Sequence, residues 1–303
     1  PEALAPRGNL PSLRCRRFCL DLAARTYIMG VLNVTPDSFS DGGLRLDPGR
    51  AVEHAHQMVE DGADLIDVGG ESTRPGSEPV STEEELRRIL PPLKGLVGKI
   101  PVPISVDTYK ADVAAVVLAE GVDIINDISG LGFDPRVAAV VGEAGAALVI
   151  THIRGTPRTM QQDPGYTDLL GEIREYLHER IRLAEAQGVL AEAIAVDPGI
   201  GFGKRAEHNL LLLKHLPELQ ALQKPILVGP SRKSFIGKVL DLPVEERLEG
   251  TAAAVAVAIW QGANVIRVHD VQVMVRVARM TDAIRREMGP EDQGGGTTGK
   301  KEG

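Results

Sequence analysis

One repeated unit dominates the sequence. A helix-like stretch ends at a glycine, a short apolar run follows, and a polar residue ends that run, with copies that begin at Gly62, Gly121, Gly145 and Gly262. Glycine suits the left-handed position just after a helix. A short β-branched run without alternation is typical of a strand buried on both faces. The repeat therefore predicts helices that alternate with the strands of a parallel sheet.

Four further apolar runs complete a set of eight predicted strands, at residues 27–33, 103–107, 193–197 and 225–229. Helical periodicity fills the remaining spans, at residues 48–61, 81–96, 110–120, 135–143, 168–187, 205–222, 244–261 and 271–288. Asp47 before Pro48 is a helix-start signal, and Ser81 with Glu84 has the spacing of a capping box. Eight strand–helix units predict an α/β fold, a (β/α)8 TIM barrel in a single domain. A doubly wound open sheet is the alternative.

The two ends of the chain lack this pattern. Residues 1–13 are rich in proline and residues 289–303 in glycine and lysine, so we expect flexible tails around a barrel domain at 14–288. The longest apolar run, 252–260, is too short to span a bilayer. Without an apolar leader, the expected location is cytoplasmic, and Cys15 and Cys19 are expected to be packing thiols.

Composition narrows the functional classes. Hydrophobic residues make up 43% of the chain and charged residues 25%, as in an ordinary globular protein. A net charge of −8 argues against nucleic acid as the main partner. The net charge still allows a local basic pocket for a phosphorylated small molecule.

Every predicted strand ends in polar residues, namely Asn33, Asp67, Asp107, Asn126 with Asp127, His152, Asp197, Ser231 to Lys233, and Arg267 with His269. In (β/α)8 barrels the loops after the strands carry the chemistry, so these residues predict a polar site at one barrel mouth. Some could be structural: Asp67 and Asp127 could bond loop amides, and His152 could be a hydrogen-bonded packing residue.

Three loops at this mouth have unusual sequences. Residues 33–43 and 69–76 are long and rich in turn formers, which predicts lids or binding loops, with surface decoration as the alternative. Residues 197–204 resemble a nucleotide loop, but they lack the G-x-G-x-x-G spacing, and Pro198 stands where a P-loop needs glycine. A tight turn that presents Asp197 and Phe202 is the better interpretation.

The charges at the strand ends suggest two kinds of contact. Cations gather late in the chain, at Arg74, Arg232, Lys233, Arg267 and His269, and such a cluster predicts an anionic ligand. Three acceptors, Asp107, Asn126 and Asp197, could receive the N–H groups of a flat heterocycle. The same three residues could also form a metal site or an acid–base pair.

Seven motifs occur in order: MGVLNVTPDSFSDGG from Met29, DVGGESTRPG from Asp67, SVDT from Ser105, INDISG from Ile125, DPGIGFGK from Asp197, SRKS from Ser231 and RVHD from Arg267. Through them the chain from residue 27 to residue 288 resembles the dihydropteroate synthases, the folate-pathway enzymes that sulfonamides inhibit. Where the family often has Met, this chain has Ile153. Ile can still cover a ring face, so only fine packing is affected.

The resemblance implies a TIM-barrel transferase, usually a homodimer. It joins 6-hydroxymethyl-7,8-dihydropterin pyrophosphate to p-aminobenzoate, giving 7,8-dihydropteroate and pyrophosphate. Asp107, Asn126, Asp197 and Lys233 would hold the pterin, and Asn33 the Mg²⁺ ion. Thr73, Arg74, Arg267 and His269 would contact the pyrophosphate, and Ser231, Phe39 and Pro75 would border the p-aminobenzoate. Phe202 is a further expected substrate contact, and Lys233, Arg267, His269 and Asp41 are the expected catalytic residues.

Two rivals share a pterin pocket. A pterin-dependent methyltransferase that acts with a corrinoid partner would need neither the pyrophosphate-binding residues nor the TPDSF segment after Asn33. A pterin-binding paralogue without activity would not need an intact set of Asn33, Arg74, Lys233 and Arg267. The sequence therefore favours the synthase.

Overall fold

The computed structural model describes residues 12–35, 47–162 and 164–287. Its centre is a parallel sheet of eight strands in the order β8-β7-β6-β5-β4-β3-β10-β9. The strands are β3 (Tyr27–Asn33), β4 (Leu65–Gly69), β5 (Ile104–Asp107), β6 (Ile124–Asp127), β7 (Ala147–Thr151), β8 (Ile194–Asp197), β9 (Leu227–Val228) and β10 (Val265–Val268). Val196 of β8 forms a parallel bridge to Ile226, and its N–H donates to the carbonyl of Pro225 at 2.8 Å. These contacts close the sheet, so the predicted TIM barrel is confirmed and the open sheet is excluded.

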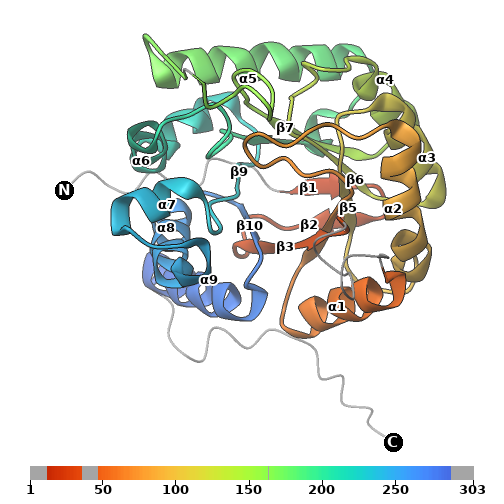
Figure 1. Cartoon of the computed structure of the whole chain (residues 1–303), viewed down its shortest axis with the longest axis horizontal. Helices are drawn as coiled ribbons and strands as arrows, with labels where there is room; N and C mark the ends of the chain where they lie inside the picture. The colour runs from red at the N-terminus through yellow and green to blue at the C-terminus, as the bar shows by residue number, and fades with distance from the viewer. Residues whose placement is uncertain (1–11, 36–46, 163, 288–303) are drawn as a thin grey trace, which may run out of the picture.

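Helices surround the barrel (Figure 1). They are α1 (Pro48–Glu60), α2 (Thr82–Leu96), α3 (Ala111–Glu120), α4 (Arg136–Ala144), α5 (Leu169–Ala186), α6 (Ala206–Lys214), α7 (Ser234–Leu240), α8 (Leu248–Trp260) and α9 (Val271–Arg286), with short 3₁₀ turns η1 (Ala191–Ala193), η2 (Leu216–Leu222) and η3 (Val244–Glu246). The helix predicted at 205–222 is divided, because Pro217 has no N–H to continue an α-helical ladder. Helix α7 was not predicted.

The predicted helix starts are only partly confirmed. The Asp47 carboxylate accepts the N–H groups of Gly49 and Arg50, as expected for an N-cap. The Ser81 hydroxyl accepts the N–H of Glu84 at 3.2 Å. The Glu84 carboxylate, however, binds the side chains of Arg87 and Arg88, so only half of the predicted capping box forms.

A short hairpin closes the lower end of the barrel. Its strands β1 (Leu13–Cys15) and β2 (Phe18–Leu20) are antiparallel. Leu13 and Cys15 pack against the inward-facing side chains of the barrel strands. These are Met29, Leu65, Ile124, Val149, Ala195, Leu227 and Val265. Cys15 is thus a packing thiol as expected, whereas Cys19 is exposed. The domain boundary expected at residue 14 stays a prediction, although β1 begins one residue earlier.

The alternate side chains of the strands point outward and pack against the helices. Ile28, Ile66, Ile125 and Ile266 share one cluster with the buried faces of the helices. Because side chains alternate along a strand, the next inward positions above the hairpin core are Asp67, Asn126 and Arg267. The strand period therefore directs these polar side chains into the lumen, near the carboxyl ends of the strands.

No helix in the described ranges is both long enough and apolar enough to cross a membrane. The expected tails fall almost entirely outside those ranges and stay predictions.

Candidate active site

The centre of the barrel mouth is a buried network around Asp67. Its Oδ2 accepts the Nε–H of Arg267 at 2.6 Å and the Nδ2–H of Asn126 at 3.0 Å. A second Arg267 nitrogen donates to Asp107 Oδ2 at 3.0 Å. The Arg267 guanidinium is thus held by two carboxylates, which fixes its plane and leaves its remaining N–H groups for a ligand.

Burial raises the pKa of Asp107 to about 7, and the nearby Arg267 guanidinium opposes that rise. Asp67 is fully buried, and its Oδ1 has no hydrogen-bond partner among the described residues. A buried polar atom without a partner carries a free-energy cost. Asp67 Oδ1 is therefore a hydrogen-bond acceptor that a ligand at the barrel mouth could use.

The loop after β8 presents Asp197 as the sequence predicts. Asp197 Oδ1 accepts the N–H of Gly199 at 2.6 Å, and the N–H of Phe202 donates to the carbonyl of Gly199 at 3.0 Å. Gly199 has a φ of +72°, and a Cβ on it would lie 1.9 Å from the carbonyl oxygen of His152. Only glycine permits this approach, so the predicted tight turn is confirmed.

Lys233 is the N-cap residue just before α7, and its side chain packs on this loop. Its Nζ lies 4.2 Å from the centroid of the Phe202 ring. Burial lowers the pKa of Lys233 to about 8, and Asp197 and Asp107 oppose that change. Burial also raises the pKa of Asp197 to about 6. A cation, an aromatic face and an acceptor therefore meet on one side of the lumen.

His269 follows β10 and pairs with the loop after β9. Its Nδ1 lies 3.0 Å from Ser231 Oγ. Burial, aided by the Arg267 charge, lowers the pKa of His269 to about 4, so the imidazole is neutral at pH 7. Arg232 pairs with Asp270 at 2.5 Å. The predicted cation cluster therefore contains one neutral imidazole and two arginines, Arg232 and Arg267, that carboxylates already engage.

Asn33 ends β3 beside Gly69 of β4. A Cβ on Gly69 would lie 3.6 Å from Asn33 Oδ1 and 4.0 Å from Asp107 Oδ2, so two oxygen donors border the space that this glycine leaves open. Oxygen donors suit Mg²⁺, which commonly takes one or two protein ligands and fills its shell with water and substrate phosphates. Within the described ranges, no group of three His, Cys, Asp or Glu side chains could hold a metal.

Thr73, Arg74 and Pro75 lie in the loop between β4 and α2, with Arg74 and Pro75 exposed. This loop reaches the one after β7, because the N–H of Gly76 donates to the carbonyl of Pro157 at 3.0 Å. In the described part of the chain, no hydrogen bond joins the side chains of Thr73 or Arg74 to the barrel network. Phe39 and Asp41 lie outside the described residues, and their roles stay predictions.

For Asp67, Asp127 and His152 a purely structural role was the alternative, and their contacts show which of them have one. Asp127 does bond loop amides, accepting the N–H groups of Ser129 and Leu131 at 2.7 Å each. His152 is a buried packing residue whose Nδ1 lies 2.8 Å from Lys204 Nζ. Among the described residues, Asp67 accepts from the Arg267 and Asn126 side chains and from no loop amide. It lies at the polar mouth as its strand-end position predicts, although no contact with a ligand was predicted for it.

The comparisons with known proteins agree with this geometry. The family described as "Pterin binding enzyme" matches residues 29–269. A dihydropteroate synthase of Synechocystis is 49% identical over 277 residues, which cover 91% of this chain and 96% of the relative. A crystal structure of Yersinia pestis dihydropteroate synthase in a sulfonamide drug complex has a TM-score of 0.86 and 42% identity, and covers 91% of this chain and 99% of that one. A Xanthomonas albilineans dihydropteroate synthase with 4-aminobenzoic acid has a TM-score of 0.84 and 41% identity, with coverage of 91% and 98%.

Fold and site together define a TIM-barrel enzyme whose polar mouth holds a fixed arginine among carboxyl and amide acceptors. The family match makes it a pterin-binding barrel. Within these enzymes, the chain belongs to the dihydropteroate synthase family of transferases.

Proposed function

We propose that the barrel mouth joins 6-hydroxymethyl-7,8-dihydropterin pyrophosphate to p-aminobenzoate and releases pyrophosphate. The observation that carries this proposal is the Arg267 guanidinium, fixed between Asp67 and Asp107 at the bottom of the mouth. A cationic hydrogen-bond donor that can bind an anion lies here beside several hydrogen-bond acceptors. This combination suits a ligand with a polar heterocycle at one end and a pyrophosphate at the other.

The acceptors supply the pterin contacts. Asp107, Asn126 and Asp197 face the lumen from β5, β6 and β8 and can receive ring N–H and amino groups. Lys233 above Phe202 can donate to a ring carbonyl or nitrogen. These positions are the ones that the family resemblance assigns to the pterin.

The donors supply the leaving-group contacts. Arg267 and His269 lie at the end of β10, and Thr73 and Arg74 lie in the loop after β4. In the reaction the methylene carbon–oxygen bond breaks, pyrophosphate takes the electron pair, and the aryl amine forms a bond to the same carbon and loses a proton. Donors aimed at the departing oxygens lower the barrier to bond cleavage.

Mg²⁺ is part of this proposal. Asn33, with Asp107 nearby, would hold the ion, which supplies charge neutralisation for pyrophosphate when bound. The amine needs no strong general base, because an aniline attacks as a neutral nucleophile. Ser231, Pro75 and Phe39 are proposed to border the p-aminobenzoate.

A homodimer is the proposed assembly. Val257 and Trp260 of α8 and Met280 and Ile284 of α9 are exposed apolar residues on two helices that pack together. Apolar residues gathered on neighbouring helices are typical of an interface between subunits. Sedimentation velocity of the wild type and of a Met280→Glu variant tests this assembly. A cytoplasmic location stays a prediction from the sequence.

Pyrophosphate release tests the reaction. The purified protein is incubated with Mg²⁺ and the pterin pyrophosphate, with and without p-aminobenzoate, and both pyrophosphate and dihydropteroate are quantified. Equal amounts of both products are expected only with p-aminobenzoate present. Methyl transfer to a corrinoid protein without pyrophosphate release would instead support the methyltransferase rival, and pterin binding without turnover would support the inactive paralogue.

A further inference from the structure

The loop between β4 and α2 is tied together at its base by Lys110. Its Nζ donates to Glu71 Oε2 at 2.6 Å, to Glu85 Oε2 at 2.5 Å and to the carbonyl of Val80 at 2.8 Å. Glu71 begins the loop, Val80 ends it and Glu85 lies in α2. All three donors of one ammonium group therefore join the two ends of the loop to the helix that follows.

A second set of contacts encloses Glu71. Its other oxygen, Oε1, accepts the hydroxyl of Tyr109 at 2.7 Å, and Oε2 also accepts the N–H of Val80 at 3.1 Å. The Glu71 and Glu85 side chains are 7% and 1% exposed, and that of Lys110 is 16% exposed. Bonds shielded from water to this degree restrict local opening more than exposed ion pairs do.

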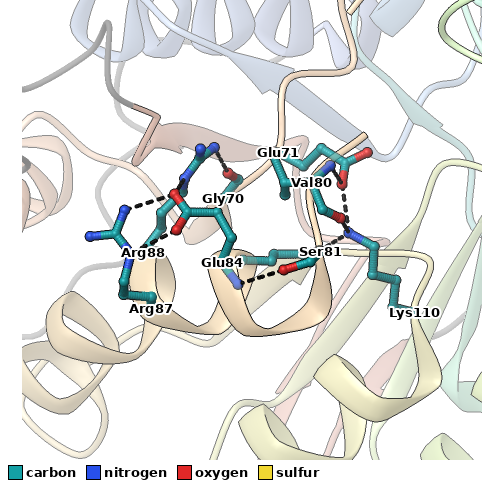
Figure 2. Close-up of polar contacts among 9 residues, drawn as sticks. Gly70, Glu71, Val80, Ser81, Glu84, Arg87, Arg88 and Lys110 are labelled. Carbon is teal, nitrogen blue, oxygen red and sulfur yellow. Dashed lines mark hydrogen bonds and ion pairs between the residues drawn. The ribbon is translucent and has the colours of Figure 1, made fainter. Parts of the chain in front are cut away.

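The preceding residue is held from the opposite side. Arg88 of α2 donates to the carbonyl of Gly70 at 2.9 Å and also binds Glu84. In Figure 2 the Gly70–Arg88 contact and the Glu71–Lys110 contact lie on either side of the start of the loop. A Cβ on Gly70 would lie 2.6 Å from Ile89 Cγ2, so the chain here packs closely on the helix.

We propose that Lys110 is a positioning residue, which fixes Thr73, Arg74 and Pro75 in the arrangement that binds the pyrophosphate part of the substrate. The first and last residues of the loop from 71 to 80 are both hydrogen-bonded to this one ammonium group. Lys110 itself touches no residue of the lumen network in the contacts of the described chain. The inference rests on the proposed function, because it assumes that this loop binds the pyrophosphate.

The experiment measures two affinities by calorimetry in the presence of Mg²⁺, one for inorganic pyrophosphate and one for a hydroxymethylpterin that lacks pyrophosphate. In Lys110→Met the loop is expected to adopt its binding arrangement less often. If the population of that arrangement falls to about a tenth, the affinity for pyrophosphate falls about tenfold. The affinity for the pterin should stay within about twofold of the wild-type value. Lys110→Arg is expected to restore most of the loss. Lys94→Met is the matched control, because Lys94 lies on α2 in an exposed pair with Glu120.

Tyr109→Phe provides a milder test, since it removes one bond to Glu71 and leaves no buried carboxylate without a cation. A smaller selective loss of pyrophosphate affinity is expected, together with faster amide exchange in residues 71–80. Unchanged pyrophosphate affinity in both variants, or equal loss of both ligands, would overturn the inference. If Lys110→Met does not fold, Tyr109→Phe decides by the same two criteria. Failure of the wild type to bind pyrophosphate would instead count against the proposed function.

Discussion

Arg267 and Asp67 are 200 residues apart in sequence and meet in the barrel lumen, with Arg267 Nε 2.6 Å from Asp67 Oδ2. Their strands are not neighbours, because β3 lies between β4 and β10. The same Asp67 oxygen also accepts from Asn126. One buried carboxylate thus orients a donor proposed for pyrophosphate and an amide proposed for the pterin.

Asp67→Asn is expected to weaken this orientation with little change of shape. The amide nitrogen meets donors from Arg267 or Asn126, and a buried donor without an acceptor costs about 1–3 kcal/mol. Both the free energy of unfolding and kcat/KM for pyrophosphate release should fall. Denaturant titration and steady-state kinetics measure them, with Asp112→Asn as the control, because Asp112 is exposed on α3. Normal kcat/KM in Asp67→Asn would contradict the orienting role.

Asp197→Asn is expected to weaken pterin binding much more than p-aminobenzoate binding. A carboxylate that accepts two ring donors loses one acceptor on amidation, which costs about 1–3 kcal/mol, or roughly one to two decades of affinity. Calorimetry with each ligand measures the difference. Unchanged pterin affinity would remove Asp197 from the proposed pocket.

Asn33 variants test the proposed metal site. Asn33→Ala removes an oxygen donor and should raise the Mg²⁺ concentration that gives half-maximal activity, whereas Asn33→Asp retains a donor and should need no more Mg²⁺ than the wild type. Chelation with EDTA should abolish turnover in all three proteins, and added Mg²⁺ should restore it. Identical Mg²⁺ dependence in the alanine variant would exclude Asn33 as a ligand.

His152 predicts how stability depends on pH. Burial, with the charges of Lys204 and Arg154, lowers its pKa from 6.5 to about 2. Below pH 6.5 the unfolded chain binds a proton that the folded chain does not, so stability is lost as pH falls, by about 1.4 kcal/mol per unit. His152→Gln should remove this part of the slope between pH 6.5 and 4.5. Chemical unfolding over that range measures it, and an unchanged slope in His152→Gln would contradict the prediction.

The order of bond breaking is a further prediction. The proposed site offers Arg74, Arg267 and His269 to the departing pyrophosphate, and the amine needs no base. We therefore expect carbon–oxygen cleavage before amine attack. Heavy oxygen in the bridging position of the pterin pyrophosphate should move to non-bridging positions with enzyme and Mg²⁺ alone, and Asp41→Ala should slow this movement.

A label that stays in place during normal turnover would mean either concerted attack or a pyrophosphate that cannot rotate. Exchange of labelled free pyrophosphate into the substrate distinguishes these two cases, because it needs cleavage but no rotation of the bound group.

Much of the architecture is local and can therefore be predicted from the sequence. Helix caps, glycines after helices and short β-branched runs depend on neighbouring residues, so the eight strands and the barrel were predicted correctly. The motifs at the strand ends also placed Asp107, Asn126, Asp197 and Arg267 at one mouth. Helix α7 and the hairpin β1–β2 were missed, because segments this short carry little periodic signal.

Other features depend on the tertiary structure. The barrel brings Asp67 to Arg267 across β3, places Arg232 beside Asp270 and buries His269, which lowers its pKa to about 4. Sequence spacing alone does not determine such contacts, because partners, burial and local charge exist only once distant strands share one lumen. The sequence by itself thus determined which chemical groups reach the mouth of the barrel, and the tertiary structure decided which of them are paired, charged and oriented toward a ligand.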